Sequence, residues 1–149
     1  MPTYHQYATT HTARSNPLAL RIEPPVLTVD RDAVSATTER APDQLSQTTL
    51  KVIHLLLTGD LFRLRSETIA DELGISPTTL RRRLRADRLC YQGILDQVRQ
   101  YRCEKQLTQR WLPGKTLAWD LGYAEVNSFY RAFKRWSGEN YSDIKRRFV

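Results

Sequence analysis

Basic side chains gather at two places in the second half of this 149-residue chain. The first group is Arg81, Arg82, Arg83 and Arg85, and the second is Arg131, Lys134 and Arg135. A guanidinium can form paired hydrogen bonds with a phosphate or with a guanine base, and an ammonium group binds phosphate as a point charge. If rigid elements hold them on one surface, these groups predict binding to a polyanion.

The element that must position the first group is the stretch SETIADELGISPTTLRRRLRADR, residues 66–88, which predicts two short helices joined by a tight turn. Ser66 and Ser76 can cap the two helices, and Gly74 provides the backbone freedom for the turn. The inward positions recur with helical spacing, at Ile69, Ala70, Leu73, Leu80 and Leu84. A basic second helix in such a pair fits a DNA major groove, whereas an ordinary solvated helix with a charge run is the alternative for this stretch alone.

The same pattern occurs a second time, at residues 115–137. Ile69, Ala70, Leu73 and Gly74 correspond to Leu117, Ala118, Leu121 and Gly122, which lie 48 positions later. Beyond the turn the offset is 49, and Leu80, Arg82, Leu84 and Arg85 correspond to Phe129, Arg131, Phe133 and Lys134. Two matched units are harder to obtain by chance than one, so the repeat favours two helix-turn-helix units.

A linking helix is predicted between the units, at residues 91–109. At the rise of an α-helix it would be roughly 28 Å long, which is close to the roughly 34 Å between successive major-groove faces of B-DNA. One chain could therefore reach two adjacent major-groove segments, and no dimer is required for that.

The net charge of +7 is unevenly distributed. Residues 1–45 contain four arginines and five acidic residues, whereas residues 46–149 contain 19 basic and 11 acidic residues. The basic excess is therefore confined to the part with helical patterning, which favours nucleic acid as the polyanion. No stretch approaches the roughly 18 apolar residues of a membrane span, and the first twenty residues lack the apolar core of a secretory signal. We therefore expect a cytoplasmic protein, associated with the nucleoid, and no membrane partner.

Several kinds of chemistry have little support in the sequence. Cys90 and Cys103 lack CxxC spacing and are expected to be reduced, buried side chains. His5 and His11 have no cysteine or carboxylate nearby that could complete a metal site. His54 lies inside a predicted helix and is expected to be a structural residue. No paired carboxylate with a histidine, glycine-rich phosphate loop or Cys/His arrangement is present, so we expect no enzyme, cofactor or metal site.

The N-terminal segment, residues 1–45, has weaker signals. Residues 1–17 lack a helical or strand period, and short strands are predicted at 18–22 and 26–29. The polar residues 33–46 are expected to form turns, so we place a domain boundary there. The segment is either flexible or the remnant of a sensor domain, and no domain for a small-molecule effector is evident in it.

Residues 47–148 resemble the DNA-binding domain of the AraC/XylS family of bacterial transcription regulators. The resemblance is carried by IADELGISPTTLRRRL, VRQYRCEKQL and LAWDLGYAEVNSFYRAFKRWSG. It implies an all-α, homeodomain-like fold of seven helices, in which two helix-turn-helix subdomains are joined by a linking helix and the third and sixth helices enter the major groove. It also implies transcription activation through binding upstream of a promoter and contact with RNA polymerase.

The resemblance assigns contacts to both units by position. The residues it implies as base contacts are Thr78, Arg81, Arg82, Val126, Asn127, Tyr130 and Arg131. Arginine can recognise guanine and asparagine adenine, whereas threonine and valine offer mainly apolar contact to a thymine methyl group. The residues expected to contact phosphates are Ser76, Thr79, Arg83, Arg85, Lys134 and Arg135, and such contacts fix register without reading sequence. A solvated surface role remains the alternative for each arginine singly.

The aromatic side chains of the second unit are expected to pack rather than to stack on bases. Phe129, Phe133 and Trp136 fall on the inner face of their helix by spacing, and Trp111 and Trp119 are also assigned to packing.

Some positions depart from the family pattern. Arg88 stands where a helix-ending glycine is usual, which costs roughly 1 kcal/mol if the site needs a positive φ. Tyr141, Ile144 and Lys145 replace a customary Pro, Tyr and Arg, and only about 45 residues precede the domain, fewer than a sensor domain needs.

The sequence leaves three functions in competition. The first is a sequence-specific regulator of double-stranded promoter DNA, an activator that binds as a monomer. The second is a truncated family member that competes with a longer regulator for its sites. The third is an architectural DNA-binding protein, which would bind all sequences with similar affinity because phosphate contacts alone carry no sequence information.

Overall fold

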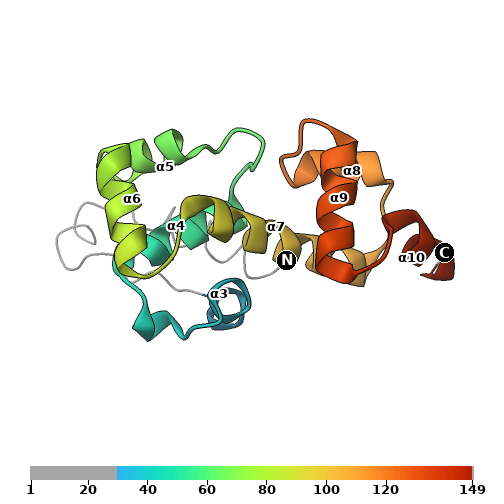
Figure 1. The fold of residues 1–149 in the computed structure, drawn as a ribbon, viewed down its shortest axis with the longest axis horizontal. Coiled ribbons are helices and arrows are strands. Elements are labelled where there is room, and N and C mark those ends of the chain that lie inside the picture. The colour runs from blue at the N-terminus through green and yellow to red at the C-terminus, as the bar shows by residue number, and fades with distance from the viewer. Residues whose placement is uncertain (1–29, 149) are drawn as a thin grey trace, which may run out of the picture.

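The computed structural model describes residues 30–148, and within them the fold is all-helical, as predicted (Figure 1). The strands predicted at 18–22 and 26–29, and His5 and His11, lie outside the described residues. The elements, in chain order, are α3 (Arg31–Thr38), a 3₁₀ turn (Pro42–Gln44), α4 (Gln47–Thr58), α5 (Ser66–Glu72), α6 (Pro77–Ala86), α7 (Tyr91–Gln109), α8 (Gly114–Asp120), α9 (Val126–Ser137) and α10 (Tyr141–Phe148). Helices α4 to α10 are the seven that the family resemblance implies, with α6 third and α9 sixth.

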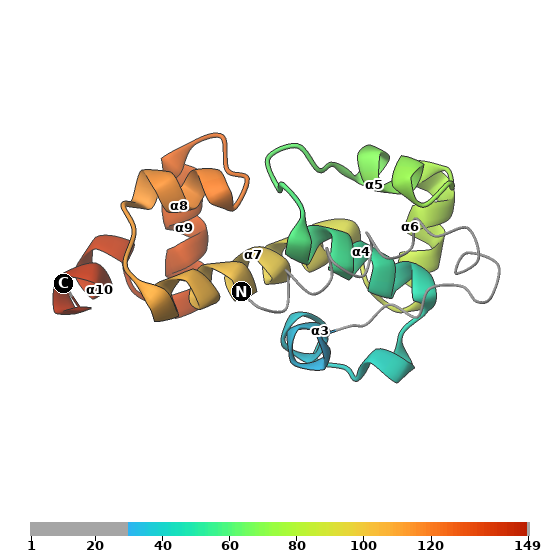
Figure 2. The same cartoon turned by 180° about the vertical axis from the view of Figure 1, so that it is seen from behind.

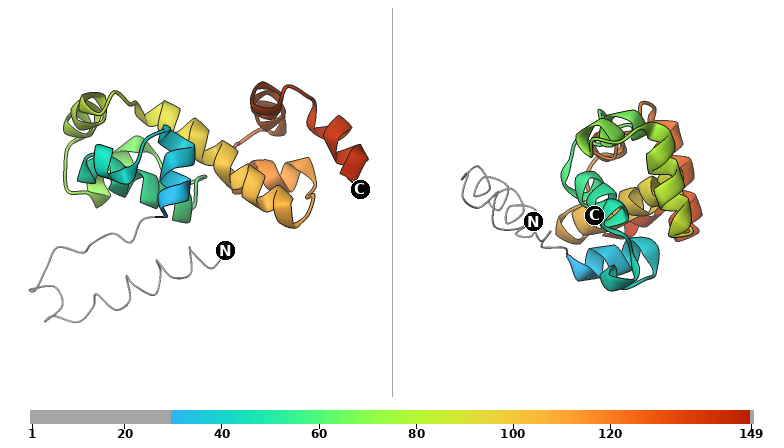
Figure 3. Two further views of the ribbon diagram at one scale, coloured as in Figure 1. Left: turned by 90° about the horizontal axis from the view of Figure 1, so that it is seen from below. Right: turned by 90° about the vertical axis from the view of Figure 1, so that its left-hand side faces the viewer.

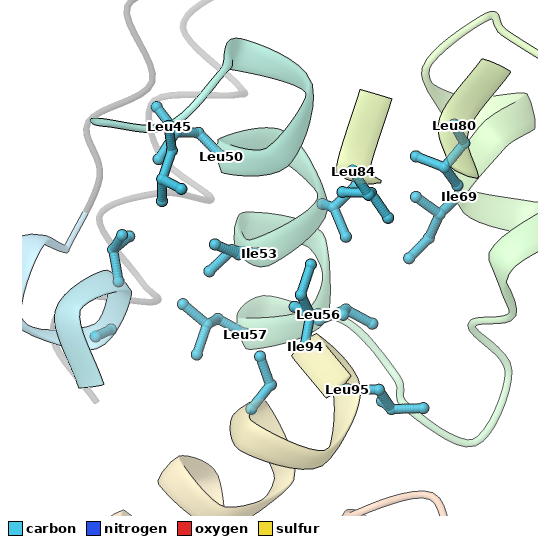
Figure 4. Close-up of a cluster of buried hydrophobic side chains, with 14 of the residues drawn as sticks. Leu45, Leu50, Ile53, Leu56, Leu57, Ile69, Leu80, Leu84, Ile94 and Leu95 are labelled. Carbon is cyan, nitrogen blue, oxygen red and sulfur yellow. The ribbon is translucent and has the colours of Figure 1, made fainter. Parts of the chain in front are cut away.

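Helix α7 joins two units that have separate cores (Figures 1 and 2). The first unit comprises α4, α5, α6 and the N-terminal half of α7, and its buried side chains include Ile53, Ile69, Leu80, Leu84 and Ile94 (Figure 4). The second unit comprises α8, α9, α10 and the C-terminal half of α7, and its buried side chains include Cys103, Leu117, Leu121, Phe129 and Tyr141. The inward positions predicted from helical spacing are thus mostly core residues, because apolar burial selects the register of each helix.

The turns of the two units have the same geometry. Gly74 has φ +69° and Gly122 has φ +83°. In the first unit the Ile75 amide donates to the Ala70 carbonyl at 3.0 Å, and in the second the Tyr123 amide donates to the Ala118 carbonyl at 2.9 Å. Both helices therefore end in a Schellman motif, in which glycine adopts the left-handed conformation at no steric cost.

Three predictions about single residues were wrong. Ser66 does not cap α5, because Arg65 holds the cap position and its side chain makes no capping bond. Cys90 is exposed rather than buried, and its Sγ accepts a hydrogen bond from the Gly93 amide at the start of α7. Trp119 is 60% exposed, although its ring stacks on Phe62. The predictions for Cys103 and His54 agree with the structure, where both side chains are buried.

The stretch expected to form turns after residue 33 instead begins with a helix. The carboxylate of Asp30 caps α3 by accepting hydrogen bonds from the Asp32 and Ala33 amides. Helix α3 packs on α7 and buries Ala33 and Val34 completely. The hydroxyl of Thr38 bonds to the Val34 carbonyl at 2.8 Å, so this polar side chain can be buried without an unsatisfied donor. Tertiary packing therefore overrides the polar composition of the stretch.

Tyr141, one of the C-terminal departures from the family pattern, packs into the second core. Tyr141 is 3% exposed, and its ring meets Phe133 edge-on at 5.1 Å between centroids. Its hydroxyl donates to the Leu112 carbonyl, which ties α10 to the segment before α8. Trp111 packs as predicted, with 5.4 Å between the centroids of its ring and the Tyr141 ring.

Candidate nucleic-acid interface

Helix α6 begins with a cap that fixes the direction of its side chains. Ser76 Oγ accepts a hydrogen bond from the Thr79 amide at 3.1 Å, and Pro77 occupies the first helical position. Leu80 and Leu84, four residues apart, are 2% and 1% exposed. Because these two residues face the core, the remaining surface of the helix faces outward.

The arginines of α6 lie on that outward surface. Arg81, Arg82, Arg83 and Arg85 are all exposed, and within residues 30–148 no carboxylate forms an ion pair with any of them. Arg83 leans toward the start of α4, where it donates to Thr48 Oγ1 at 3.3 Å. Thr78 is exposed beside them. The helix therefore presents positive charge that the described part of the protein does not neutralise.

The two hydroxyls predicted to bind phosphate at this end of the helix already bond to each other. Ser76 Oγ lies 2.9 Å from Thr79 Oγ1, and Thr79 is only half-buried. Pro77 has no N–H and the Thr79 amide already donates to Ser76 Oγ, so in this first turn a phosphate oxygen could accept from the Thr78 amide, where the helix dipole favours an anion.

Helix α9 presents the second predicted surface. Phe129 and Phe133 are 0% and 6% exposed, as expected, and Trp136 is partly buried beside them. Four of the predicted contacts, Asn127, Tyr130, Arg131 and Lys134, are exposed. Val126 is half-buried against the second core, so only part of its side chain is available for a base. Arg131 Nη2 is 3.3 Å from Ser128 Oγ, which holds the guanidinium along the helix.

Tyr130 has a packed side and an open side. It is 38% exposed, and its ring centroid lies 6.0 Å from that of Tyr141. A Cβ atom at Gly114 would lie 2.3 Å from its hydroxyl oxygen. The absence of a side chain at Gly114 is therefore what lets the Tyr130 ring lie against the start of α8.

Arg135 differs from the other predicted phosphate contacts because, within residues 30–148, it alone among them is paired with a carboxylate. Its guanidinium pairs with the carboxylate of Asp96 on α7, and the Trp136 indole donates to the same carboxylate at 3.3 Å. This arrangement fixes α9 against α7 and partly neutralises Arg135. Its role as a phosphate contact remains a prediction.

The end of α6 is fixed by Asp87, a residue that sequence reasoning missed. Its carboxylate accepts hydrogen bonds from the Thr49 hydroxyl at 2.6 Å and from the Ser46 amide at 2.9 Å, at the start of α4. Arg40 donates to the Asp87 carbonyl. Burial alone would raise the pKa of Asp87, but the hydrogen bonds from Thr49 and Ser46 outweigh it and lower the pKa. No local signal marks this residue, because its partners are about 40 positions away.

The two outward surfaces belong to one face of the molecule. In Figure 1 helices α6 and α9 both face the viewer with nearly parallel axes, and the view from below in Figure 3 shows both along the same edge. Helix α7, with 19 residues, links the two units and has the predicted bounds. Helix α3 lies off this face.

A family model described as a helix-turn-helix domain matches residues 69–147, more than half of the chain. The chain belongs to the AraC-type helix-turn-helix family. The chain is 33% identical over 81 residues to the HTH-type transcriptional regulator VqsM of Pseudomonas aeruginosa, a match covering 54% of this chain and 25% of that protein. It is 38% identical over 79 residues to the ornithine utilization regulator of the same species, covering 53% and 23%.

The solved structures agree with this membership. The crystal structure of the transcriptional regulator CdpR from Pseudomonas aeruginosa matches with a TM-score of 0.61 and 28% identity, over 76% of this chain and 37% of that one. This AraC-type chain spans about a quarter of the length of the curated relatives it matches. Membership of a family of helix-turn-helix transcription regulators implies regulation through DNA binding. No helix within residues 30–148 is long and apolar enough to cross a membrane.

Proposed function

We propose that this chain is a sequence-specific transcription regulator that binds double-stranded DNA as a monomer, with α6 and α9 in two adjacent major-groove segments. The observation that carries the proposal is the pair of exposed, basic helices on one face. They are joined by a 19-residue helix whose length, roughly 28 Å, is close to the roughly 34 Å between successive major-groove faces of B-DNA. The family's curated members that match the chain are themselves described as regulators.

Base reading is assigned to the positions that the family resemblance implies, which are exposed except for the half-buried Val126. In α6 these are Thr78, Arg81 and Arg82, and in α9 they are Val126, Asn127, Tyr130 and Arg131. Arginine and asparagine supply hydrogen-bond patterns that distinguish base pairs, so Arg82, Arg131 and Asn127 should dominate specificity. Register is assigned to phosphate contacts from Ser76, Thr79, Arg83, Arg85, Lys134 and Arg135.

Within this proposal the chain acts in the cytoplasm, on nucleoid DNA, as an activator that contacts RNA polymerase at a promoter. This step is tested by an in vitro transcription assay, with a template that carries the DNA site selected by the protein from a random library. More transcript on addition of the protein supports activation. No effect alone, but loss of the transcript driven by a longer family member from the same site, would identify a competitor instead.

The experiment that tests DNA recognition is selection of bound duplexes from a random library at about 150 mM salt, where non-specific binding is weakened. The expected result is a site with two short motifs about one helical turn apart, bound by one protein molecule in sedimentation analysis. Recovery of a library without enrichment would favour the architectural alternative. A site with a single motif would contradict simultaneous reading by α6 and α9.

A further inference from the structure

We propose that Arg99 and the stacked rings of Phe62 and Trp119 hold the two helix-turn-helix units at one fixed separation, so that the protein selects DNA sites by the spacing of their two motifs. The inference rests on the proposed function, because it assumes that both units read DNA. It assigns Arg99 as a positioning residue that touches no base or phosphate.

Arg99 projects from α7 and bonds to the turn of the second unit. Its Nε donates to the Leu121 carbonyl at 2.7 Å, and its Nη2 donates to the Gly122 carbonyl at 3.2 Å. Its guanidinium also lies 4.2 Å from the centroid of the Tyr123 ring. Val98, the residue before it, belongs to the core of the first unit. One half-buried side chain therefore joins the first unit's section of α7 to the turn that precedes α9.

A second contact joins the units away from α7. Phe62, in the segment between α4 and α5, stacks on Trp119 of α8 with 4.2 Å between ring centroids and an interplanar angle of 23°. Next to this pair the backbones come close, since a Cβ atom at Gly122 would lie 2.6 Å from the Leu61 carbonyl oxygen. Both rings are exposed, at 38% and 60%, so the stack contributes little to either core. Its structural consequence is to tie the units together.

These two contacts restrict movements that a helix alone would allow. A linking helix can bend, and each unit has its own core that could tilt about its end of α7. Arg99 from α7 and Phe62 from the segment between α4 and α5 both hold the end of α8 and the turn after it. Two elements of the first unit therefore fix the same part of the second unit, which opposes a tilt of one unit against the other. Adding one base pair between two motifs moves the second by about 3.4 Å and about a tenth of a turn. We call the Arg99 bonds and the Phe62–Trp119 stack the clamp. A protein whose units are held by this clamp cannot follow that displacement without losing contacts between one of its units and DNA.

The test is a series of duplexes carrying the site recovered with the wild-type protein, in which one or two base pairs are added or removed between the motifs. The wild type is expected to lose affinity at least about tenfold for one base pair. Arg99→Gln is expected to bind the original duplex less well but to show a flatter dependence on spacing. Trp119 is exposed, so Trp119→Ala leaves both cores intact, and it is expected to flatten the dependence of affinity on spacing as well.

Arg102→Gln is the matched control. Arg102 lies one turn further along α7 and donates to the Leu56 and Gly59 carbonyls, which belong to the first unit. Its loss should lower stability and leave the shape of the spacing dependence unchanged. If Arg99→Gln and Trp119→Ala keep the wild-type dependence, the clamp is overturned while DNA reading stands. If the wild type itself tolerates every spacing, the two-motif function fails, and the clamp loses its role.

A measurement without DNA separates these outcomes further. Spin labels at Glu72→Cys and Lys115→Cys, both exposed, report the distance between the units in a Cys90→Ser background. The serine Oγ replaces the Cys90 Sγ as the capping acceptor of the Gly93 amide. Cys103 is 1% exposed and should stay unlabelled. The distance distribution is expected to be single and narrow, to broaden with Arg99→Gln and to stay narrow with Arg102→Gln. An unchanged width for Arg99→Gln would overturn the proposal.

Discussion

Arg88 shows how one side chain can oppose the local backbone. It follows α6 with φ +60°, and the Leu89 amide donates to the Leu84 carbonyl at 3.0 Å, as in the Schellman motifs that end α5 and α8. Those two helices use glycine at this position, whereas arginine pays a steric penalty there. The hydrogen bonds of the cap still form, so the strain is confined to one residue.

Replacement of Arg88 by glycine should therefore raise the free energy of unfolding by about 1 kcal/mol, because it removes that strain. Urea denaturation measures the change. Gly74→Ala is the converse control: no atom lies within 4 Å of its added Cβ, so a loss of about 1 kcal/mol would come from φ alone. A fall in stability for Arg88→Gly would mean that the arginine side chain makes contacts worth more than the strain.

Base recognition is also decided at single residues. Arg82→Ala or Arg131→Ala should each weaken binding of the selected duplex by about 1–3 kcal/mol and relax the preference at one base pair. Competition binding with every single-base variant of the site measures both effects. Arg31→Ala, an exposed arginine of α3 away from this face, should change neither. Unchanged specificity in both variants would reject the assignment of these residues to bases.

At the scale of elements, Asp87 links α6 to the start of α4 and makes this link sensitive to pH. The lowered pKa of Asp87 means that its ionised form is favoured by folding. The stabilisation is therefore present above the unfolded pKa of about 3.9 and is lost as the pH falls through the lower folded value. The helix that carries the first arginine group is thus held to its unit most firmly near neutral pH.

Asp87→Asn should lower the free energy of unfolding by about 1–2 kcal/mol at pH 7, since the hydrogen bonds lose their charged acceptor. The difference from the wild type should shrink below about pH 4, where the wild-type carboxylate also becomes neutral. Denaturation curves at several pH values measure it, with the exposed Asp71→Asn as control. If the difference stays the same at low pH, the link between α6 and α4 depends on the shape of the Asp87 side chain rather than on its negative charge.

Local sequence patterns were sufficient to predict most of the helices, but not the contacts between them. Strong periodicity and turn glycines predicted α4 to α9 and the equivalence of the two units, because burial of one helix face fixes a local, repeating pattern. Helix α3 was missed because only two of its buried residues, Ala33 and Val34, are apolar, while the other two, Thr37 and Thr38, are polar and give no hydrophobic period. The core positions of α6 and α9 were predicted from their spacing, and the outward direction of the DNA-contacting residues follows from them. The partners of Asp87, Asp96 and Arg99 depend on packing between distant segments, which local patterns do not contain.

The whole molecule includes more than the two reading units, because α3 packs on α7 beside the first core. Val34 is 0% exposed, and its helix precedes the boundary predicted after residue 45. If α3 folds together with the domain, Val34→Ala should lower the free energy of unfolding by about 1–3 kcal/mol through the cavity it leaves. Ser35→Ala, exposed on the same helix, should stay within about 0.5 kcal/mol of the wild type.

Urea denaturation followed separately by tryptophan fluorescence and by circular dichroism measures both variants and tests for a single transition. The tryptophans, Trp111, Trp119 and Trp136, all lie in the second unit, whereas α3 contacts the first unit's side of α7. A shift of both signals by Val34→Ala would show that α3, the first unit and the second unit unfold cooperatively, and that the domain begins before residue 45. Equal stability of the Val34 and Ser35 variants would instead place α3 outside the folding unit and support the predicted boundary.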